Sequence, residues 1–507
     1  GVLAKFPRDW RVSLDAQYGH SITRYRGIQG TDSEAWRRLV DTGAYNPLRD
    51  TQLHAPPAAF YDEVIVFYGA KDRFVTLGDY QTFDTAVRVT NQSIPLPTGS
   101  GAVNFGGDYR VNQLAGYTSE LRNGRGELVE SPVRFTGRTV ERVSVFGELL
   151  APVVAPHVLP SWIREIQTDL AARYVVSDSA QESNLAPTAG LKFDFAGGFS
   201  LRGSVSTSNR FPTPFMSRRV SGGAGPGGGE VTLEDISDPR FGGERYGVQS
   251  SIAQNPNLRS EANITRTVGI LLQRGDVHRF RFSADFSDTR KADELFTLDA
   301  QGAVNLEADF PERIRRSPAT GRIEHVLTGP INLAERHSQS WSTAADYAWT
   351  ESFGGRLDLY TRWSYFPRYE TKTFPDSPTI DQIRAPDGTL SLLEHRLNFG
   401  GSWSNRLLGF GVDGHYYHSR RLPVALWPAQ HRRTIDPYLQ FDAYVQADLT
   451  KWIPWKNPRV GLRGQLRVDN LFDAAPPYFA ADPIRAGVQP YTDWRRQTYA
   501  FTLQATF

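Results

Sequence analysis

The side chains best suited to chemistry in this chain are histidine, arginine and the aromatic residues, and their spacing argues against a catalytic centre. The ten histidines are scattered, and the closest pair, His415 and His418, is separated by an odd interval. On a strand an odd interval places two side chains on opposite faces, so this pair cannot hold one metal ion together. No H-E-x-x-H, G-x-S-x-G or Walker motif occurs. The sequence therefore predicts no enzyme, no metal and no cofactor.

Tyrosine and arginine near predicted strand ends are better placed to meet a ligand than to catalyse a reaction. These groups bind aromatic, carboxylate or sugar-like ligands by stacking and by bidentate hydrogen bonds. The remaining charges on the same strand faces are interpreted as structural charges that pair with one another or with water. The candidate ligand-binding residues are Tyr417, Arg420, Arg421, Tyr438, Arg240 and Arg245.

The segments that must position these residues are strands with two different faces. Leu439, Phe441 and Val445 alternate with polar residues, and the same alternation recurs around Leu357–Tyr365, Phe280–Phe286 and Leu462–Val468. Period-two alternation over about ten residues indicates strands that touch two media and are long enough to cross a bilayer at a tilt. A soluble sandwich also alternates, but its strands are nearer ~5–6 residues long.

The connections between these strands alternate between short and long. Short turns are predicted around Pro7–Asp9, Pro95–Gly101, Pro152–Pro160, Ala196–Gly198, Arg274–Asp276, Glu351–Gly355, Asn405–Gly409 and Pro454–Pro458. Long polar loops are predicted near residues 26–77, 212–257 and 291–336. Tight turns at one end and extended loops at the other are typical of outer-membrane barrels, whose short turns face the periplasm.

Composition supports a membrane β-barrel and excludes other classes. Hydrophobic residues make up 39% of the 507 residues, and no apolar run is long enough for a transmembrane helix. A barrel exposes only alternate residues to lipid and is hydrophilic on average. The chain has no cysteine, which fits passage through an oxidising periplasm. A net charge of +2 gives no indication of nucleic-acid binding.

The strand count predicts an all-β transmembrane antiparallel barrel that extends beyond this chain. About sixteen strands are expected from Trp10 to Phe507. The opening residues Gly1–Trp10 look like the end of an earlier strand followed by a turn. Because an open sheet edge is not tolerated in lipid, we expect residues 1–507 to form part of a larger barrel.

Several motifs resemble those of the TonB-dependent outer-membrane transporters. Asn470–Asp473 with Pro476 and Pro477 resembles a late-barrel N-L-F-D motif, and Asn255–Glu261 resembles an N-P-x-L-x-x-E motif. Ser208–Pro214 resembles an F-R-A-P-type strand end, although its Arg and Phe stand in a different order. Gly43–Leu48 resembles an N-P-F/L element of an outer loop. The final alternating strand resembles the family's assembly signal, with the residues Tyr499, Phe501, Leu503 and Phe507.

The resemblance implies active uptake of a scarce nutrient across the outer membrane. It implies a barrel of about 22 strands, of which residues 1–507 lack the first strands, and an N-terminal plug domain that is also expected to lie outside these residues. It further implies partners that include outer-membrane lipid, the TonB complex and the barrel assembly machinery. Siderophore, cobalamin, glycan and peptide ligands all remain open. The alternatives are a passive porin of about sixteen strands, a barrel enzyme, or a structural subunit of a larger envelope assembly.

Overall fold

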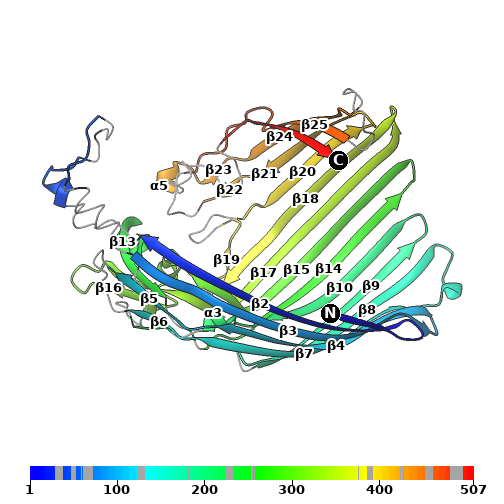
Figure 1. Ribbon diagram of the computed structural model, residues 1–507, viewed down its shortest axis with the longest axis horizontal. Helices are drawn as coiled ribbons and strands as arrows, with labels where there is room; N and C mark the ends of the chain where they lie inside the picture. Colours follow the sequence, from blue (N-terminus) through cyan, green and yellow to red (C-terminus); the bar gives the residue numbers. More distant parts are fainter. Residues whose placement is uncertain are drawn as a thin grey trace.

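A computed structural model shows the chain as one large, tilted and curved antiparallel sheet (Figure 1). It describes residues 1–28, 38–46, 49, 53–58, 60, 72–122, 132–179, 182–217, 220–222, 232–252, 255, 257–374, 376–384, 392–422, 424, 427–450, 461–479 and 495–506. The predicted turn at Pro454–Pro458 and the predicted signal residue Phe507 lie outside these residues. No helix in the described part is both long and apolar enough to cross a membrane.

The wall is a series of long strands, each paired antiparallel with the next. In order of pairing they are β1 (Val2–Lys5), β2 (Trp10–Ile28), β3 (Asp72–Leu96), β4 (Gly99–Leu114), β7 (Arg138–Pro152), β8 (Ile163–Ser177), β9 (Glu182–Phe195), β10 (Phe199–Arg210), β14 (Glu261–Arg274), β15 (His278–Leu298), β17 (Ile323–Ser352), β18 (Gly355–Lys372), β20 (His395–Ser404), β21 (Leu408–Tyr417), β24 (Tyr438–Asp448), β25 (Gly461–Asp469) and β26 (Thr498–Thr506). Within the described residues, no pairing joins β1 or β2 to β26. The all-β antiparallel prediction is confirmed.

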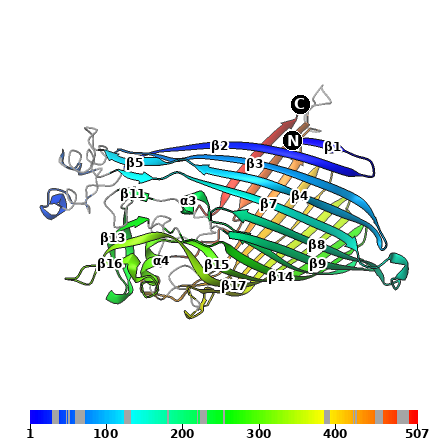
Figure 2. The same cartoon turned by 90° about the horizontal axis from the view of Figure 1, so that it is seen from below.

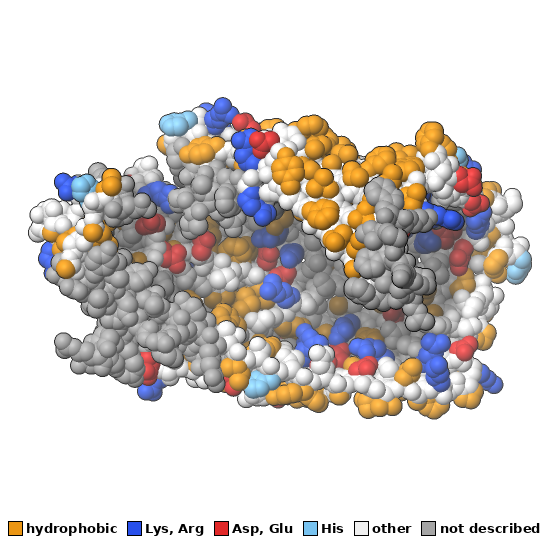
Figure 3. All heavy atoms as spheres, turned by 45° about the horizontal axis from the view of Figure 1, so that its top comes forward, with side chains coloured by type: hydrophobic (Ala, Val, Ile, Leu, Met, Phe, Trp, Pro, Cys, Tyr) orange, Lys and Arg blue, Asp and Glu red, His pale blue; other side chains and the backbone are white. Residues whose placement is uncertain are grey.

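The two faces of the wall differ in chemistry, as the alternation predicts. Large apolar side chains on one face are exposed, among them Leu14, Phe83, Phe105, Val143, Leu170, Val205, Val268, Leu359, Phe410, Val445 and Phe501. The opposite, concave face carries charged and polar side chains, many of them in ion pairs between strands. Asp15 and Arg88 bridge the neighbouring strands β2 and β3, and Arg202 of β10 reaches Asp285 of β15 across β14. Figure 3 shows charged side chains within the hollow and hydrophobic ones along the outer margins. We call these the outer and inner faces.

The short turns gather at one end of the wall and the long connections at the other (Figures 1 and 2). The turn between β7 and β8 holds a single turn of 3-10 helix, Pro156–Val158. The turn between β9 and β10 depends on two glycines, Gly197 and Gly198, which both have positive φ. A Cβ on Gly198 would lie 1.9 Å from the Gln273 carbonyl oxygen, so only glycine fits there.

Two of the predicted long loops fold together into a small unit with its own core, which we call the loop module. It comprises β12 (Thr232–Asp238), η3 (Pro239–Phe241), β13 (Glu244–Ile252), α4 (Ala300–Asn305), η4 (Pro311–Arg313), β16 (Ile314–Arg316) and the first residues of β17. Its core is Ile236, Val248, Ala300, Ala303, Val304, Ile323 and Val326. Residues from 212–257 and 291–336 thus form one hydrophobic cluster, because neither loop alone could bury these side chains.

Shorter elements complete the long-connection end. Three short strands extend the sheet from the N-terminal end of β3. There β5 (Tyr117–Arg122) pairs with β3, β6 (Val133–Phe135) pairs with β5, and β11 (Val220–Gly222) pairs with β6. A separate two-stranded ribbon joins β22 (Arg420–Arg421) to β23 (Thr434–Ile435), with α5 (Trp427–Gln430) between them. The helix α3 (Pro214–Ser217) lies against β4 and β7, and β19 (Ile380–Asp381) pairs with β18.

Candidate functional site

A row of aromatic and cationic side chains crosses the inner face near the long-connection end, and we call it the rim row. Cross-strand pairing places Arg396 of β20 opposite Tyr417 of β21, and Tyr417 opposite Tyr438 of β24. The Arg396 guanidinium lies 5.5 Å from the centre of the Tyr417 ring, and the two tyrosine rings are 6.4 Å apart. Such a row can stack on a planar or sugar-like group and attract an anion. Tyr417 is half-buried, whereas Tyr438 is buried.

The other predicted ligand-binding residues lie on two separate elements. Arg420 is buried and Arg421 exposed on β22, beside a small core of Leu422, Ile435, Phe479 and Trp427. Arg240 and Arg245 are exposed on the loop module, where Arg240 pairs with Glu307 at 3.1 Å. The structure therefore brings Tyr417 and Tyr438 together and distributes the four arginines over two loops. Whether these residues bind a ligand stays a prediction.

Below the rim row, two carboxylates face each other across β21 and β24. Asp413 accepts a hydrogen bond from the Tyr360 hydroxyl at 2.7 Å. Asp442 accepts from Gln440 at 2.7 Å and from the Asn470 amide at 2.8 Å, with His415 at 3.4 Å and Arg467 at 3.6 Å. These partners offset the repulsion between the two carboxylates, so Asp413 and Asp442 belong to one hydrogen-bonded polar network on the inner face.

The two closest histidines do lie on opposite faces, as the odd spacing predicts. On the inner face, Nδ1 of His415 lies within hydrogen-bond distance of Asn398 Oδ1, at 2.9 Å. On the outer face, Nδ1 of His418 lies 3.1 Å from the Tyr416 hydroxyl, and the His418 ring is perpendicular to that of His395. Trp363 and Tyr365 stack on the same His395 ring. Across the described residues, no group of three or more His, Asp or Glu side chains is arranged to hold a metal ion.

The loop module is fixed by a buried ion network. Asp238 is fully buried and accepts from both terminal nitrogens of Arg316, at 2.8 and 3.0 Å, and from the Tyr246 hydroxyl at 2.5 Å. Arg316 also binds Glu307 through two further hydrogen bonds, at 2.8 and 2.6 Å. Burial alone would raise the pKa of Asp238, but the hydrogen bonds from Arg316, Tyr246 and the Arg240 amide hold it below its ordinary value. The network joins residues from both long loops.

This lowered pKa predicts how the loop module responds to acid. A carboxyl whose pKa is lower in the folded state contributes stability that is fully present above its unfolded pKa of about 4 and lost as pH falls through the folded value. We therefore expect protection of the β12 and β13 amides from hydrogen exchange, corrected for the intrinsic pH effect, to be unchanged from pH 7 to pH 5. Protection lost already between pH 7 and pH 5 would contradict the lowered pKa.

The motif residues noted in the sequence hold loops onto the wall. Glu261, at the end of the N-P-x-L-x-x-E stretch, is buried, binds the Lys291 ammonium at 2.9 Å and accepts from the Leu295 amide at 3.2 Å. It also lies 3.8 Å from Arg210, which belongs to the F-R-A-P-like stretch and faces Glu261 across the β10–β14 pair. Two stretches separated in sequence therefore meet in space, and their role here is structural.

Asn470 in the N-L-F-D stretch shapes the chain after β25. It is buried, has a φ of 56°, and its side chain both donates to the Ala474 carbonyl and accepts from the Ala474 amide at 2.8 Å. Replacing Asn470 by glycine keeps the left-handed backbone but removes both hydrogen bonds, so we expect a loss of roughly 1–3 kcal/mol of local stability. Alanine should cost about 1–2 kcal/mol more, because its Cβ is strained there. Hydrogen exchange at Ala474 measures both, and equal effects of the two variants would contradict the backbone argument.

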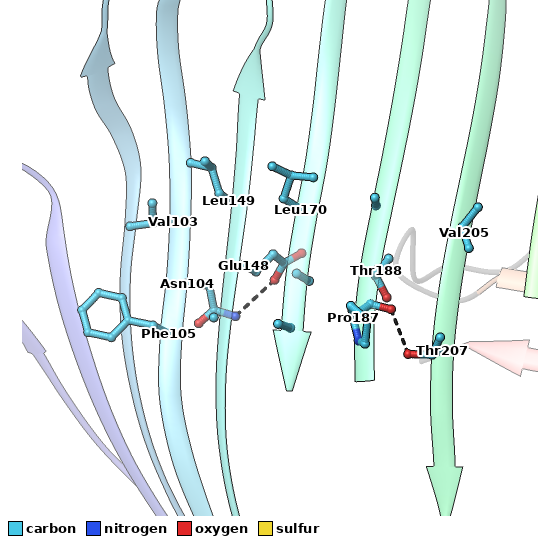
Figure 4. Close-up of a pocket in the computed structure, with 14 residues that line it drawn as sticks. Val103, Asn104, Phe105, Glu148, Leu149, Leu170, Pro187, Thr188, Val205 and Thr207 are labelled. Carbon is cyan, nitrogen blue, oxygen red and sulfur yellow. Dashed lines mark hydrogen bonds between the residues drawn. The ribbon is translucent and has the colours of Figure 1, made fainter. Parts of the chain in front are cut away.

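A large, mostly apolar depression lies on the outer face of the wall. Its volume is about 700 Å³ and it crosses β4, β7, β8, β9 and β10 (Figure 4). Its lining includes Gly147, Ala172 and Pro187, which lie opposite one another on β7, β8 and β9, and the larger apolar residues Phe105, Leu149, Leu170 and Val205. Its polar groups bond within the wall, Asn104 to Glu148 at 3.4 Å and Thr207 to the Pro187 carbonyl at 3.0 Å. An apolar depression on this face fits contact with lipid.

Comparison with known proteins identifies the wall. The family model described as the TonB-dependent receptor-like β-barrel matches residues 4–471. The chain belongs to this TonB-dependent receptor family. Members are outer-membrane β-barrel proteins that take up ligands, and the family is one of receptors and transporters rather than enzymes. The resemblance found in the sequence motifs is confirmed. No curated protein matches the chain.

Two solved structures agree with the wall in fold at very low sequence identity, and a third is similar over a larger share of its own length. The outer membrane transporter YddB from Escherichia coli is 10% identical with a TM-score of 0.52, over 86% of this chain and 54% of that one. The ferripyoverdine receptor of Pseudomonas aeruginosa is 9% identical with a TM-score of 0.51, over 99% and 54%. The siderophore receptor PirA from Acinetobacter baumannii is 11% identical with a TM-score of 0.47, over 99% and 69%. The chain thus spans about half the length of YddB and of the ferripyoverdine receptor.

Proposed function

We propose that this TonB-dependent receptor wall binds a nutrient at its long-connection end and delivers it to the periplasm with energy from the TonB complex. The observation that carries the proposal is the separation of the two faces: an exposed apolar outer face and an ion-paired inner face on the same strands. A sheet of this kind suits a boundary between lipid and a polar lumen. In the membrane we propose that the sheet belongs to a closed barrel, because lipid does not tolerate an open edge.

The rim row and the arginines of the loops are the proposed recognition surface. Arg396 beside Tyr417, with Arg421, Arg240 and Arg245 on the surrounding loops, combines positive charge with an aromatic surface. This chemistry favours a ligand that carries both planar groups and negative charge, a description that several ferric siderophores meet. Cobalamin, glycans and peptides are the other classes for the binding screen.

Uptake experiments with defined probes test the proposal. Cells that express the protein would be given ⁵⁵Fe-loaded siderophores, cyanocobalamin, a maltodextrin or an oligopeptide, with the TonB complex active or inactivated. We expect concentrative uptake of one probe class, which disappears without TonB. Entry of small solutes that is indifferent to TonB would overturn the proposal and indicate a passive porin instead.

Tyr417 offers a residue-level test once a probe binds. Replacing Tyr417 by alanine removes the central ring of the rim row, and loss of one buried aromatic contact typically weakens binding by roughly tenfold. Tyr347, which stacks on His278 near the short turns, provides the control. Tryptophan fluorescence titration of the purified protein should show weaker probe binding for Tyr417→Ala and unchanged binding for Tyr347→Ala. Equal affinities for both variants would remove the rim row from the binding site.

A further inference from the structure

The inner wall of β4, β7 and β8 carries more guanidinium groups than the neighbouring carboxylates can pair. Arg110 binds Asp84 through two hydrogen bonds, one of them 2.6 Å long. Arg173 binds Asp108 and the Ser144 hydroxyl, the latter at 2.7 Å, and Ser144 in turn donates to Asp108 at 2.5 Å. Both carboxylates are therefore already engaged. A third guanidinium, that of Arg142, lies in the same charge cluster.

Arg142 has no counter-ion in the part of the chain that the structure describes. It makes no hydrogen bond or ion pair there, and its Nε is shielded from solvent without an acceptor. Strand register places it directly opposite Arg110 across the β4–β7 pair. Four residues along the same face, Arg138 also has a shielded Nε with no acceptor. Like charges directly opposite on neighbouring strands destabilise a sheet, so this arrangement calls for an anion.

We propose that the inner wall carries an oxyanion-binding site centred on Arg142, which takes a carboxylate or phosphate group. Guanidinium is the side chain best suited to planar, bidentate recognition of either group. The site is built, since Asp84, Asp108 and Ser144 hold the flanking arginines in place while Arg142 retains its donors. The inference concerns the lumen and is independent of which nutrient is carried.

Two sources can supply this chemistry: a free anion in the lumen, or a carboxylate of a polypeptide seated inside the wall. Thermal unfolding of the purified protein separates them, with inorganic phosphate as the probe against chloride at matched ionic strength. Arg142→Met keeps the length of the side chain and removes its charge. Arg362→Met on β18 is the control, because Arg362 is an inner-face arginine that already has a partner, Asp346.

If the anion is free, phosphate raises the melting temperature of the wild type and of Arg362→Met. Arg142→Met should then bind phosphate roughly tenfold more weakly or not at all, the loss expected for a charged hydrogen bond. If a polypeptide carboxylate fills the site, phosphate has no effect, Arg142→Met melts at a lower temperature, and Arg142→Lys restores it. Either result supports the site.

A melting temperature that stays the same or rises in Arg142→Met, with no effect of phosphate, overturns the proposal. Without any bound anion, removing Arg142 relieves its repulsion with Arg110, so Arg142→Met would melt at the same or a higher temperature and phosphate would have no effect. An equal response of the wild type and Arg142→Met to phosphate would also overturn it, because the binding would then lie elsewhere. A lower melting temperature of Arg142→Met that Arg142→Lys does not restore would mean a packing role and not a charge.

Discussion

Replacing Arg316 by methionine is expected to destabilise the loop module by roughly 3–5 kcal/mol, the cost of leaving a buried charge without its partner. Arg316 is only 13% exposed and is the shared partner of Asp238, which is fully buried, and of Glu307. Methionine fills similar space but donates no hydrogen bond. Asp238 would then remain buried beside a core of Ile236, Val248 and Val326, with only the Tyr246 hydroxyl and the Arg240 amide left as donors.

Hydrogen exchange of the β12, β13 and β16 amides measures this effect, with Arg315→Met as the matched control. Arg315 is the preceding residue, mostly exposed, and 3.9 Å from the exposed Glu324. An exposed pair of this kind contributes about 0–1 kcal/mol, so the control should leave exchange nearly unchanged. Wild-type protection in Arg316→Met would show that the module does not depend on its buried network.

Placing arginine at Val445 should cost roughly 2–4 kcal/mol of barrel stability if the residue faces lipid near the middle of the bilayer. Val445 is 55% exposed on β24, between Phe410 of β21 and Leu466 of β25, which are exposed apolar residues too. A soluble protein would bury this row of apolar side chains in its core. The cost therefore depends on a lipid environment and reports the orientation of the strand.

Gln446→Arg provides the comparison, because Gln446 is the next residue and points to the inner face opposite Gln465. There the added charge meets a polar lumen, so folding should be close to normal. Heat-modifiable migration on gels and urea unfolding in lipid vesicles measure both variants. Equal stability of the two would contradict the assignment of the faces.

The wall could be predicted from the sequence because its signal is local. The alternation around Leu439–Leu449 depends on neighbouring residues only, and the same side chains decide both the strand and its orientation. The separation of His415 and His418 followed from the same rule. The N-L-F-D stretch is local in the same way, because Asn470 donates to the Ala474 carbonyl and accepts from the Ala474 amide.

Features that depend on distant pairing were not predictable in this way. In the loop module Ile236 packs in one core with Val326, about ninety residues later, and Asp238 pairs with Arg316, about eighty residues later. No sequence periodicity predicts such distant contacts. The sequence placed Arg240 and Arg245 in a loop but gave no sign that the loop is folded. The sequence did not predict that Arg142 lacks a counter-ion either, since this depends on which strands lie beside β7.

The most direct test of the account is a single-cysteine scan of Leu439–Ala447 in lipid vesicles, which the absence of natural cysteine makes simple. A nitroxide at each position would be read by its relaxation with oxygen, which partitions into lipid, and with a water-soluble nickel chelate. The account predicts period-two alternation, with oxygen access at Leu439, Phe441, Ala443, Val445 and Ala447 and lower access between them. Access that does not alternate, or nickel access at the outward positions, would contradict a wall that separates lipid from a polar lumen.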